Sequence, residues 1–254
     1  VFASFNFLRT GTSGLIAQAF GQDDIGEQQA VFWRAIVIAL VLGMLIIAVS
    51  QLILWAELLF MQPSPDVAEA MSTYLSIRLL SSPMALVNYS VLGALLGRAR
   101  ATLGLSLQFL LNGVNITMSI WLGLVLEWRL AGVAWGTVIA ESIAAVAGMA
   151  VVTAQFRRHS PPTIQSILDR AALSRLFSVN RDIMIRSFLL LTAFGFFART
   201  GAQLGPVPLA ANAILSRFFL VASYFSDGLQ RRLNTYAAVR SERIIHRRSI
   251  VEFA

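Results

Sequence analysis

Four polar side chains recur at helical spacing within a segment that carries no charged residue. They are Gln108, Asn112, Asn115 and Ser119, and the charge-free segment runs from 101 to 126. At 100° per residue the four fall within about 60° of one another, so they form one stripe along a helix. Lipid cannot satisfy their hydrogen-bonding groups, so we expect the stripe to face other helices or a water-filled cavity. Bonding between helices is the simpler use of any one of them, whereas four on one face favour a cavity.

A second polar group follows in the next apolar segment, where Thr137 and Glu141 are four residues apart. An ionised carboxylate inside a membrane helix costs at least ~2.5 kcal/mol, so Glu141 must be protonated, paired or hydrated. We interpret it as a candidate functional site, with a structural, paired or protonated glutamate as the alternative. Arg78 and Arg217 are possible intramembrane charges of the same kind, which could instead snorkel or form ion pairs.

The helices that position these groups are predicted by composition. The chain has 254 residues, of which 57% are hydrophobic and 13% charged, and its mean hydropathy is +0.70. About 20 apolar residues cross the hydrocarbon of a bilayer. We therefore predict an all-α integral membrane protein, a polytopic bundle of about seven spans. They cover the end of one span before residue 20 and then 33–56, 69–97, 101–126, 130–154, 182–204 and 206–229.

The distribution of arginine predicts the orientation. Positive charge is retained in the cytoplasm, and Arg34, Arg98, Arg100, Arg157, Arg158, Arg170, Arg175 and Arg181 fall on one side of the predicted spans, with only Arg129 and Arg199 on the other. We expect a multi-pass protein of the cell inner (plasma) membrane. The domains expected are an amino-terminal lobe (1–154), a cytoplasmic connector (155–181), two helices of a second lobe (182–229) and a basic tail (230–254). Pro161 and Pro162 interrupt the connector, and its remainder could form a short amphipathic helix on anionic lipid.

Several function classes are disfavoured. The chain has no Cys, which removes disulfides, thiolate metal sites and cysteine nucleophiles. The net charge of +7 comes from arginines scattered between apolar runs, so no nucleic-acid partner is expected. The two histidines, His159 and His246, lie outside the predicted spans, and no metal-ligand spacing is present. Neither an enzyme, a metal site nor a cofactor is therefore predicted.

Longer segments resemble one family of transporters. They are FLRTGTSGLIAQAFG (7–21), YLSIRLLSSPMALVNYSVLGALLGRAR (74–100), NGVNITMSIWLGLVLEWRLAGVAWGTVIAE (112–141) and RDIMIRSFLLLTAFGFFARTGAQLGPVPLAANAILSRFFLVASYFSDG (181–228). In order and spacing they resemble the multidrug and toxic compound extrusion (MATE) family, in its DNA-damage-inducible F (DinF) branch.

The resemblance implies a monomeric, twelve-helix exporter with two six-helix lobes in the lipid bilayer. It would antiport organic cations or drugs against H⁺ or Na⁺, and this chain would run from the end of the second helix to the eighth. The family's fifth helix has Asn-x-x-Asn followed four residues later by Asp. Asn112 and Asn115 match this pattern, Ser119 stands in the Asp position, and Thr137 matches a sixth-helix hydroxyl. Since amides and hydroxyls do not take up protons at physiological pH, coupling would rest on a first-helix acid outside this chain or on Glu141.

Three alternatives stay open at this point. One is a lipid-linked flippase of the same superfamily, whose groove would be expected to contain more arginine. Another is a membrane-embedded enzyme, and the third is a truncated product that cannot transport. The tail bears on the third, because residues 231–254 contain six Arg, each costing about 2.5–3.5 kcal/mol at mid-membrane. We expect that the tail does not span and that residues 1–254 alone do not export drugs.

Overall fold

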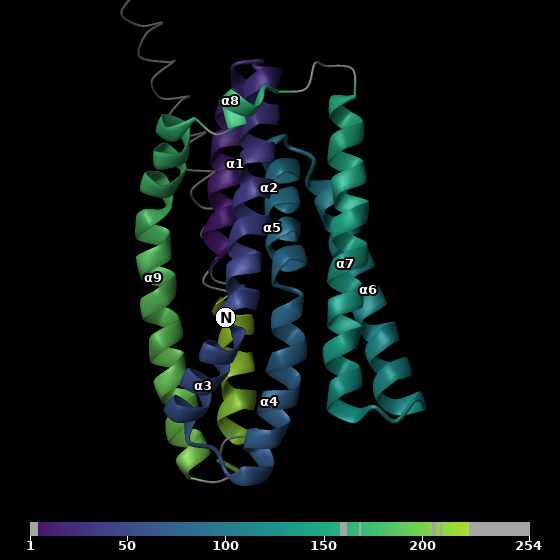
Figure 1. Ribbon diagram of the computed structural model, residues 1–254, viewed down its shortest axis with the longest axis vertical. Helices are drawn as coiled ribbons and strands as arrows, with labels where there is room; N and C mark the ends of the chain where they lie inside the picture. The colour runs from purple at the N-terminus through teal and green to yellow at the C-terminus, as the bar shows by residue number, and fades with distance from the viewer. Residues whose placement is uncertain (1–4, 158–161, 168, 205–206, 209, 224–254) are drawn as a thin grey trace, which may run out of the picture. The chain divides into compact units, whose positions relative to one another are not determined.

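The computed structural model describes residues 5–157, 162–167, 169–204, 207–208 and 210–223, and every regular element in these ranges is helical (Figure 1). The predicted all-α membrane fold is confirmed. The elements are α1 (Asn6–Gly21), α2 (Ile25–Ala48), α3 (Ser50–Met61), α4 (Pro65–Leu80), α5 (Ser82–Gly97), α6 (Ala101–Ile120), the π-helix η2 (Trp121–Val125), α7 (Arg129–Phe156), α8 (Ile164–Ile167), α9 (Arg170–Gln203) and a last helix, Ala210–Ser223.

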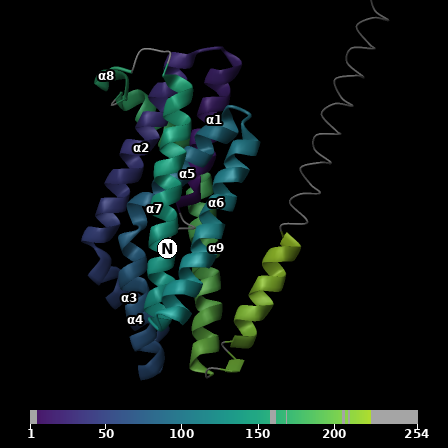
Figure 2. The same ribbon diagram turned by 90° about the vertical axis from the view of Figure 1, so that its right-hand side faces the viewer.

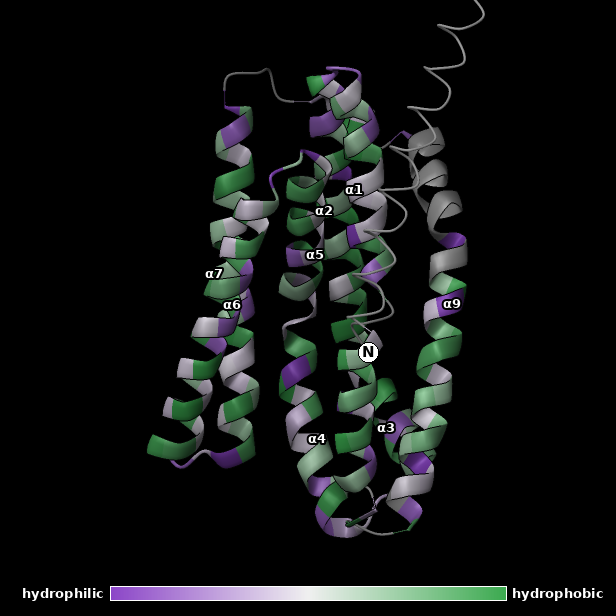
Figure 3. Ribbon diagram, turned by 180° about the vertical axis from the view of Figure 1, so that it is seen from behind, coloured by the Kyte–Doolittle hydropathy of each residue, from purple (hydrophilic) through white to green (hydrophobic). Residues whose placement is uncertain are grey.

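Three of the helices in the described ranges are long and apolar enough to cross a bilayer. They are α2, the continuous α6 and η2 (Ala101–Val125), and α7. The α4–α5 pair would be a fourth span, bent by 54° between its halves. Figure 3 shows apolar residues along these helices, with polar residues among them on α4 and α6. The bounds of the predicted spans 101–126 and 130–154 lie within two residues of the bounds of the observed helices.

The bundle packs around α5, which contacts α1, α2 and α7 (Figures 1 and 2). Its approach to α1 is close because two glycines face that helix. A Cβ at Gly93 would lie 2.6 Å from the carbonyl oxygen of Arg9, and one at Gly97 would lie 2.7 Å from that of Ser13. The small-residue spacing Gly93-x-x-x-Gly97 therefore marks a real helix contact.

The break between α4 and α5 has a local cause in Ser81-Ser82-Pro83. Pro83 has no N–H to donate and disfavours helical geometry before it. The hydroxyls of Ser81 and Ser82 donate instead to the carbonyls of Arg78 and Leu79. Pro83 then packs on α2 at Gly43, where a Cβ would lie 2.6 Å from the proline nitrogen. The predicted span 69–97 is thus two helices rather than one.

The next two helices form a tight hairpin. The turn between η2 and α7 places Glu127 and Arg129 at φ values of 56° and 51°. Gly132 and Gly136 bring α7 against the preceding helix, since a Cβ at Gly136 would lie 2.8 Å from the backbone nitrogen of Ser119. The spacing Gly132-x-x-x-Gly136 is therefore also a helix contact. The sequence has the same spacing at Gly201-x-x-x-Gly205, which extends outside the described residues.

The predicted connector is partly helical. Its short helix α8 is followed at Arg170 by α9, which continues without interruption to Gln203. The helix thus starts twelve residues before the predicted span at 182, because no proline or glycine lies between 170 and 181. The chain falls into two compact units, 1–195 and 196–254, and the predicted lobe boundaries stay a prediction. The basic tail, 230–254, lies outside the described residues.

Candidate functional site

The polar stripe of α6 turns partly toward α7. Gln108, Asn115 and Ser119 are half-buried, whereas Asn112 is exposed. The amide Nδ2 of Asn115 donates to Thr137 Oγ1 over 2.9 Å, and Thr137 Oγ1 donates to the carbonyl of Val133 over 3.0 Å. The structure thus brings two of the sequence-predicted residues into direct contact across the α6–α7 interface.

Ser119 lies one turn along the same interface. Its Oγ is buried and has no hydrogen-bond partner among the described residues. It faces Gly136, where a Cβ would lie 2.9 Å from it. A buried hydroxyl without a partner is unusual in a folded protein, so this end of the stripe has an unused hydrogen-bonding group. Gln108 and Asn112 lie on the same face of α6 but farther from this contact.

Glu141 and Arg78 form an ion pair between α7 and α4. The two guanidinium nitrogens Nη1 and Nη2 lie 2.8 and 2.7 Å from Oε2 and Oε1 of the carboxylate. Such bidentate pairs combine strong hydrogen bonds with a fixed geometry. The side chains are 17% exposed for Arg78 and 9% for Glu141. Of the states considered for Glu141, the structure has the paired one, and Arg78 is a pairing rather than a snorkelling arginine.

The pair is held by its neighbours. Arg78 Nη1 also donates to Ser81 Oγ, at the break between α4 and α5. Asn88 of α5 donates from Nδ2 to the carbonyl oxygen of Glu141 over 2.9 Å. Tyr89, the next residue of α5, is half-buried and interacts electrostatically with Glu141, Arg78 and Arg9. The carboxylate of Glu141 is therefore held by α4, and its backbone carbonyl by α5.

Comparison with known proteins identifies the fold to which this site belongs. The sequence model of the MatE family matches residues 1–121. DNA damage-inducible protein F of Escherichia coli (strain K12) is 34% identical over 224 residues, which are 87% of this chain and 49% of the relative. The chain belongs to the MatE family. The predicted family and branch are thereby confirmed.

More distant relatives of the MatE family agree. Protein DETOXIFICATION 47, chloroplastic, from Arabidopsis thaliana is 23% identical over 237 residues, 91% of this chain and 42% of that protein. An outward-facing multidrug resistance MATE transporter has the same fold, with a TM-score of 0.72, 18% identity and coverage of 88% of this chain and 49% of that one. An inward-facing one gives a TM-score of 0.69, 19% identity and coverage of 79% and 46%. The chain spans about half the length of the curated relatives it matches.

The MatE helices bring some predicted residues together and leave others apart. Thr137 and Glu141 lie one turn apart on α7, but Thr137 contacts α6 and Glu141 contacts α4 and α5. Arg217 is exposed on the helix Ala210–Ser223 of the second unit. The roles of all these residues in binding stay predictions.

Sequence analysis missed Asn88, Tyr89 and Arg9. The available signal was an amide and a phenol inside an otherwise apolar run, 79–97, and a charge within the first helical segment. Polar groups at such positions are expected to face other helices, so each could have been named as part of a polar centre. Their partners could not, because these depend on which helices pack together.

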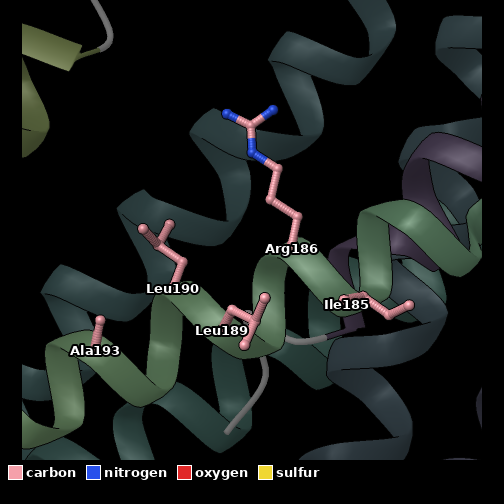
Figure 4. Close-up of a pocket in the computed structure, with 5 residues that line it drawn as sticks. All are labelled: Ile185, Arg186, Leu189, Leu190 and Ala193. Carbon is pink, nitrogen blue, oxygen red and sulfur yellow. The ribbon is translucent and has the colours of Figure 1, made fainter.

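Two surface hollows lie outside the polar site. One, of about 530 Å³, is bordered by a single stretch of α9 (Figure 4): Ile185, Arg186, Leu189, Leu190 and Ala193. The other, of about 290 Å³, lies between α2, α5 and α7 and is bordered by Ile36, Leu40, Met84, Val87, Ala145, Val146 and Met149. Neither contains a residue of the predicted site. In the described part of the chain, no group of three or more His, Asp or Glu could hold a metal ion.

Proposed function

We propose that the chain forms the amino-terminal part of a secondary active efflux transporter, which exports organic cations or drugs in exchange for H⁺ or Na⁺. The observation that carries this proposal is the hydrogen bond from Asn115 to Thr137 within a MatE fold. It joins two apolar helices through a polar face that also includes Gln108, Asn112 and Ser119, and a polar face of this kind suits a water-filled cavity.

The transport mechanism that fits this fold is alternating access by movement of one lobe against the other. The helices of this chain match both an inward-facing and an outward-facing transporter, with TM-scores of 0.69 and 0.72. This is expected if the helices of one lobe keep their packing while the lobe moves. The close contacts at Gly93 and Gly136 support such a rigid group.

Coupling of transport to H⁺ or Na⁺ would require a side chain whose charge is neutralised when the ion binds. Glu141 is the one acid among the buried polar residues of the described ranges, and the amides and hydroxyls of the stripe do not titrate at physiological pH. We therefore include Glu141 in the proposed site, together with Gln108, Asn112, Asn115, Ser119 and Thr137. The transporter would lie in the inner (plasma) membrane, with the arginine-rich side in the cytoplasm.

The test is export by a chimaera. The chain replaces the matching part of the Escherichia coli relative, which supplies the remaining sequence, and ethidium efflux is followed in an efflux-deficient host. We expect Asn115→Ala to reduce efflux, while the control Gly113→Ala retains it because nothing lies within 4 Å of a Cβ there. A well-expressed parental chimaera that does not move ethidium or other organic cations would contradict the proposed function.

A second measurement addresses the coupling ion. In proteoliposomes, Glu141→Gln is expected to lower coupled transport more than it lowers expression, and to change its dependence on pH. Glu69→Gln is the matched control, because Glu69 is an exposed acid of α4. Unchanged rates and an unchanged pH profile for Glu141→Gln would leave Glu141 with a structural role only.

A further inference from the structure

The Arg78–Glu141 pair occupies both oxygens of the one buried carboxylate in the described ranges. Arg78 of α4 pairs with this carboxylate, and Tyr89 of α5 interacts electrostatically with Glu141, Arg78 and Arg9. With the pair formed, each carboxylate oxygen accepts a guanidinium N–H of Arg78, and the positive charge of Arg78 offsets that of the carboxylate. Another cation therefore competes with Arg78 for Glu141, because the two positive charges repel each other.

The helix that carries Arg78 contributes little to the buried core of the described residues. Of the sixteen residues of α4, only Leu79 is buried, whereas α5 buries eleven of its sixteen. Arg78 lies three residues before the break at Ser81 and donates to the hydroxyl of that residue. The ion pair is therefore a polar contact that joins α4 to α7. Glu141 itself stays fixed, because Asn88 of the well-packed α5 binds its backbone carbonyl.

We propose that Glu141 is a site for a monovalent cation, Na⁺ or the proton. The guanidinium of Arg78, which is tethered to α4, occupies this site when no other cation is bound. Binding of the second cation neutralises the carboxylate and breaks its ion pair with Arg78. Arg78 is then no longer held by an ionised carboxylate, which favours its movement toward Ser81 and a change in the bend between α4 and α5. The inference rests on the proposed function in one respect, namely that this cation is the coupling ion.

The site can be tested without transport, by thermal unfolding of the 254-residue chain in detergent, followed by the fluorescence of its five Trp. We compare NaCl with choline chloride at pH 8, and pH 8 with pH 5 in choline chloride. In Arg78→Gln the carboxylate is free to bind, so we expect Tm to rise by roughly 3–6 °C when the cation is about tenfold above its Kd. The response to NaCl identifies Na⁺, and the response to pH 5 alone identifies the proton.

Two further variants make the result specific. The double variant Arg78→Gln with Glu141→Gln lacks the carboxylate and should lose the cation response. The control, Glu69→Gln, should respond as the parent chain does. If Arg78→Gln does not fold, Arg78→Lys retains a charge but loses the bidentate geometry, so the cation should compete at a lower concentration than in the parent. A folded Arg78→Gln or Arg78→Lys variant with the parent's response to both cations would overturn the proposal.

Movement of α4 can be measured separately from cation binding. Because the chain contains no Cys, spin labels can be attached at Glu69→Cys on α4 and Val146→Cys on α7, both of which are exposed. In the Arg78→Gln background, the cation that raises Tm should also shift the distance distribution between the labels. Stabilisation without any shift would refute the coupling to α4. Both readouts are independent of efflux, so their failure is distinguishable from failure of the chimaera to transport.

Discussion

The contact between Gly43 and Pro83 sets the position at which the broken span packs on α2, and Gly43→Ala tests it. A Cβ at Gly43 would lie 2.6 Å from the nitrogen of Pro83 and 3.0 Å from its Cβ. Carbon atoms in favourable contact are about 3.5–4.0 Å apart. Because these atoms belong to the backbone and a rigid ring, no side-chain rotation can relieve the overlap. The two helices must separate by roughly 1 Å.

The expected cost follows from two opposing effects. Overpacking of a well-packed contact costs about 1–3 kcal/mol, and alanine is better than glycine in a helix by about 0.8–1.0 kcal/mol. The net loss of unfolding free energy is then between about 0 and 2 kcal/mol, with a central value near ~1 kcal/mol. For a chain of this size the central value lowers Tm by about 2–4 °C.

The assay is thermal unfolding of the 254-residue chain, followed by Trp fluorescence. Gly113→Ala is the matched control, since Gly113 is also helical and nothing lies within 4 Å of a Cβ there. It gains the helix preference without the overlap, so its Tm should stay the same or rise by at most about 4 °C. A Gly43→Ala chain that unfolds at or above the parent's temperature would refute the argument from the α2–α5 contact.

Two more variants probe single hydrogen-bonded contacts. Thr137→Val removes the acceptor of Asn115 and should cost about 0.6 kcal/mol, at most ~1.7 kcal/mol, measured as a fall in Tm. Thr117→Val, whose hydroxyl bonds only within its own helix, is the control, and equal losses would argue against a special α6–α7 bond. Arg34→Gln removes bonds of 3.1 and 2.6 Å to the last carbonyls of α8, so limited proteolysis of the connector should be about tenfold faster or more. Glu27→Gln, which removes only a half-exposed ion pair with Arg34 at 3.5 Å, should leave proteolysis nearly unchanged.

How much of the fold follows from the sequence depends on the feature. The spans 101–126 and 130–154 were predictable to within two residues because charged or turn-forming residues bound both apolar runs. The sequence Ser81-Ser82-Pro83 favours a helix break at Ser81. The angle between α4 and α5, however, depends on how Pro83 packs against Gly43. A second helix break, at Val49 between α2 and α3, has no proline or glycine beside it. No local signal therefore predicts this second break.

The candidate site, like the fold, is only partly predictable from the sequence. The stripe on α6 and the spacing of Thr137 and Glu141 follow from the helical period, which the sequence contains. The partner of Glu141 does not, since Arg78 is 63 residues away and its choice depends on α4 packing beside α7. Likewise, the exposure of Asn112 and the half-burial of Asn115 reflect how α6 is rotated against its neighbour. Rotation about the helix axis is decided by tertiary contacts such as Gly136 against Ser119.

Helix α7 connects the two polar groups that were considered separately at the sequence level. Thr137 and Glu141 are one turn apart, about 5–6 Å between Cβ atoms, and the first binds α6 while the second binds α4. One turn of α7 therefore carries both contacts, and its backbone hydrogen bonds hold them at a fixed spacing.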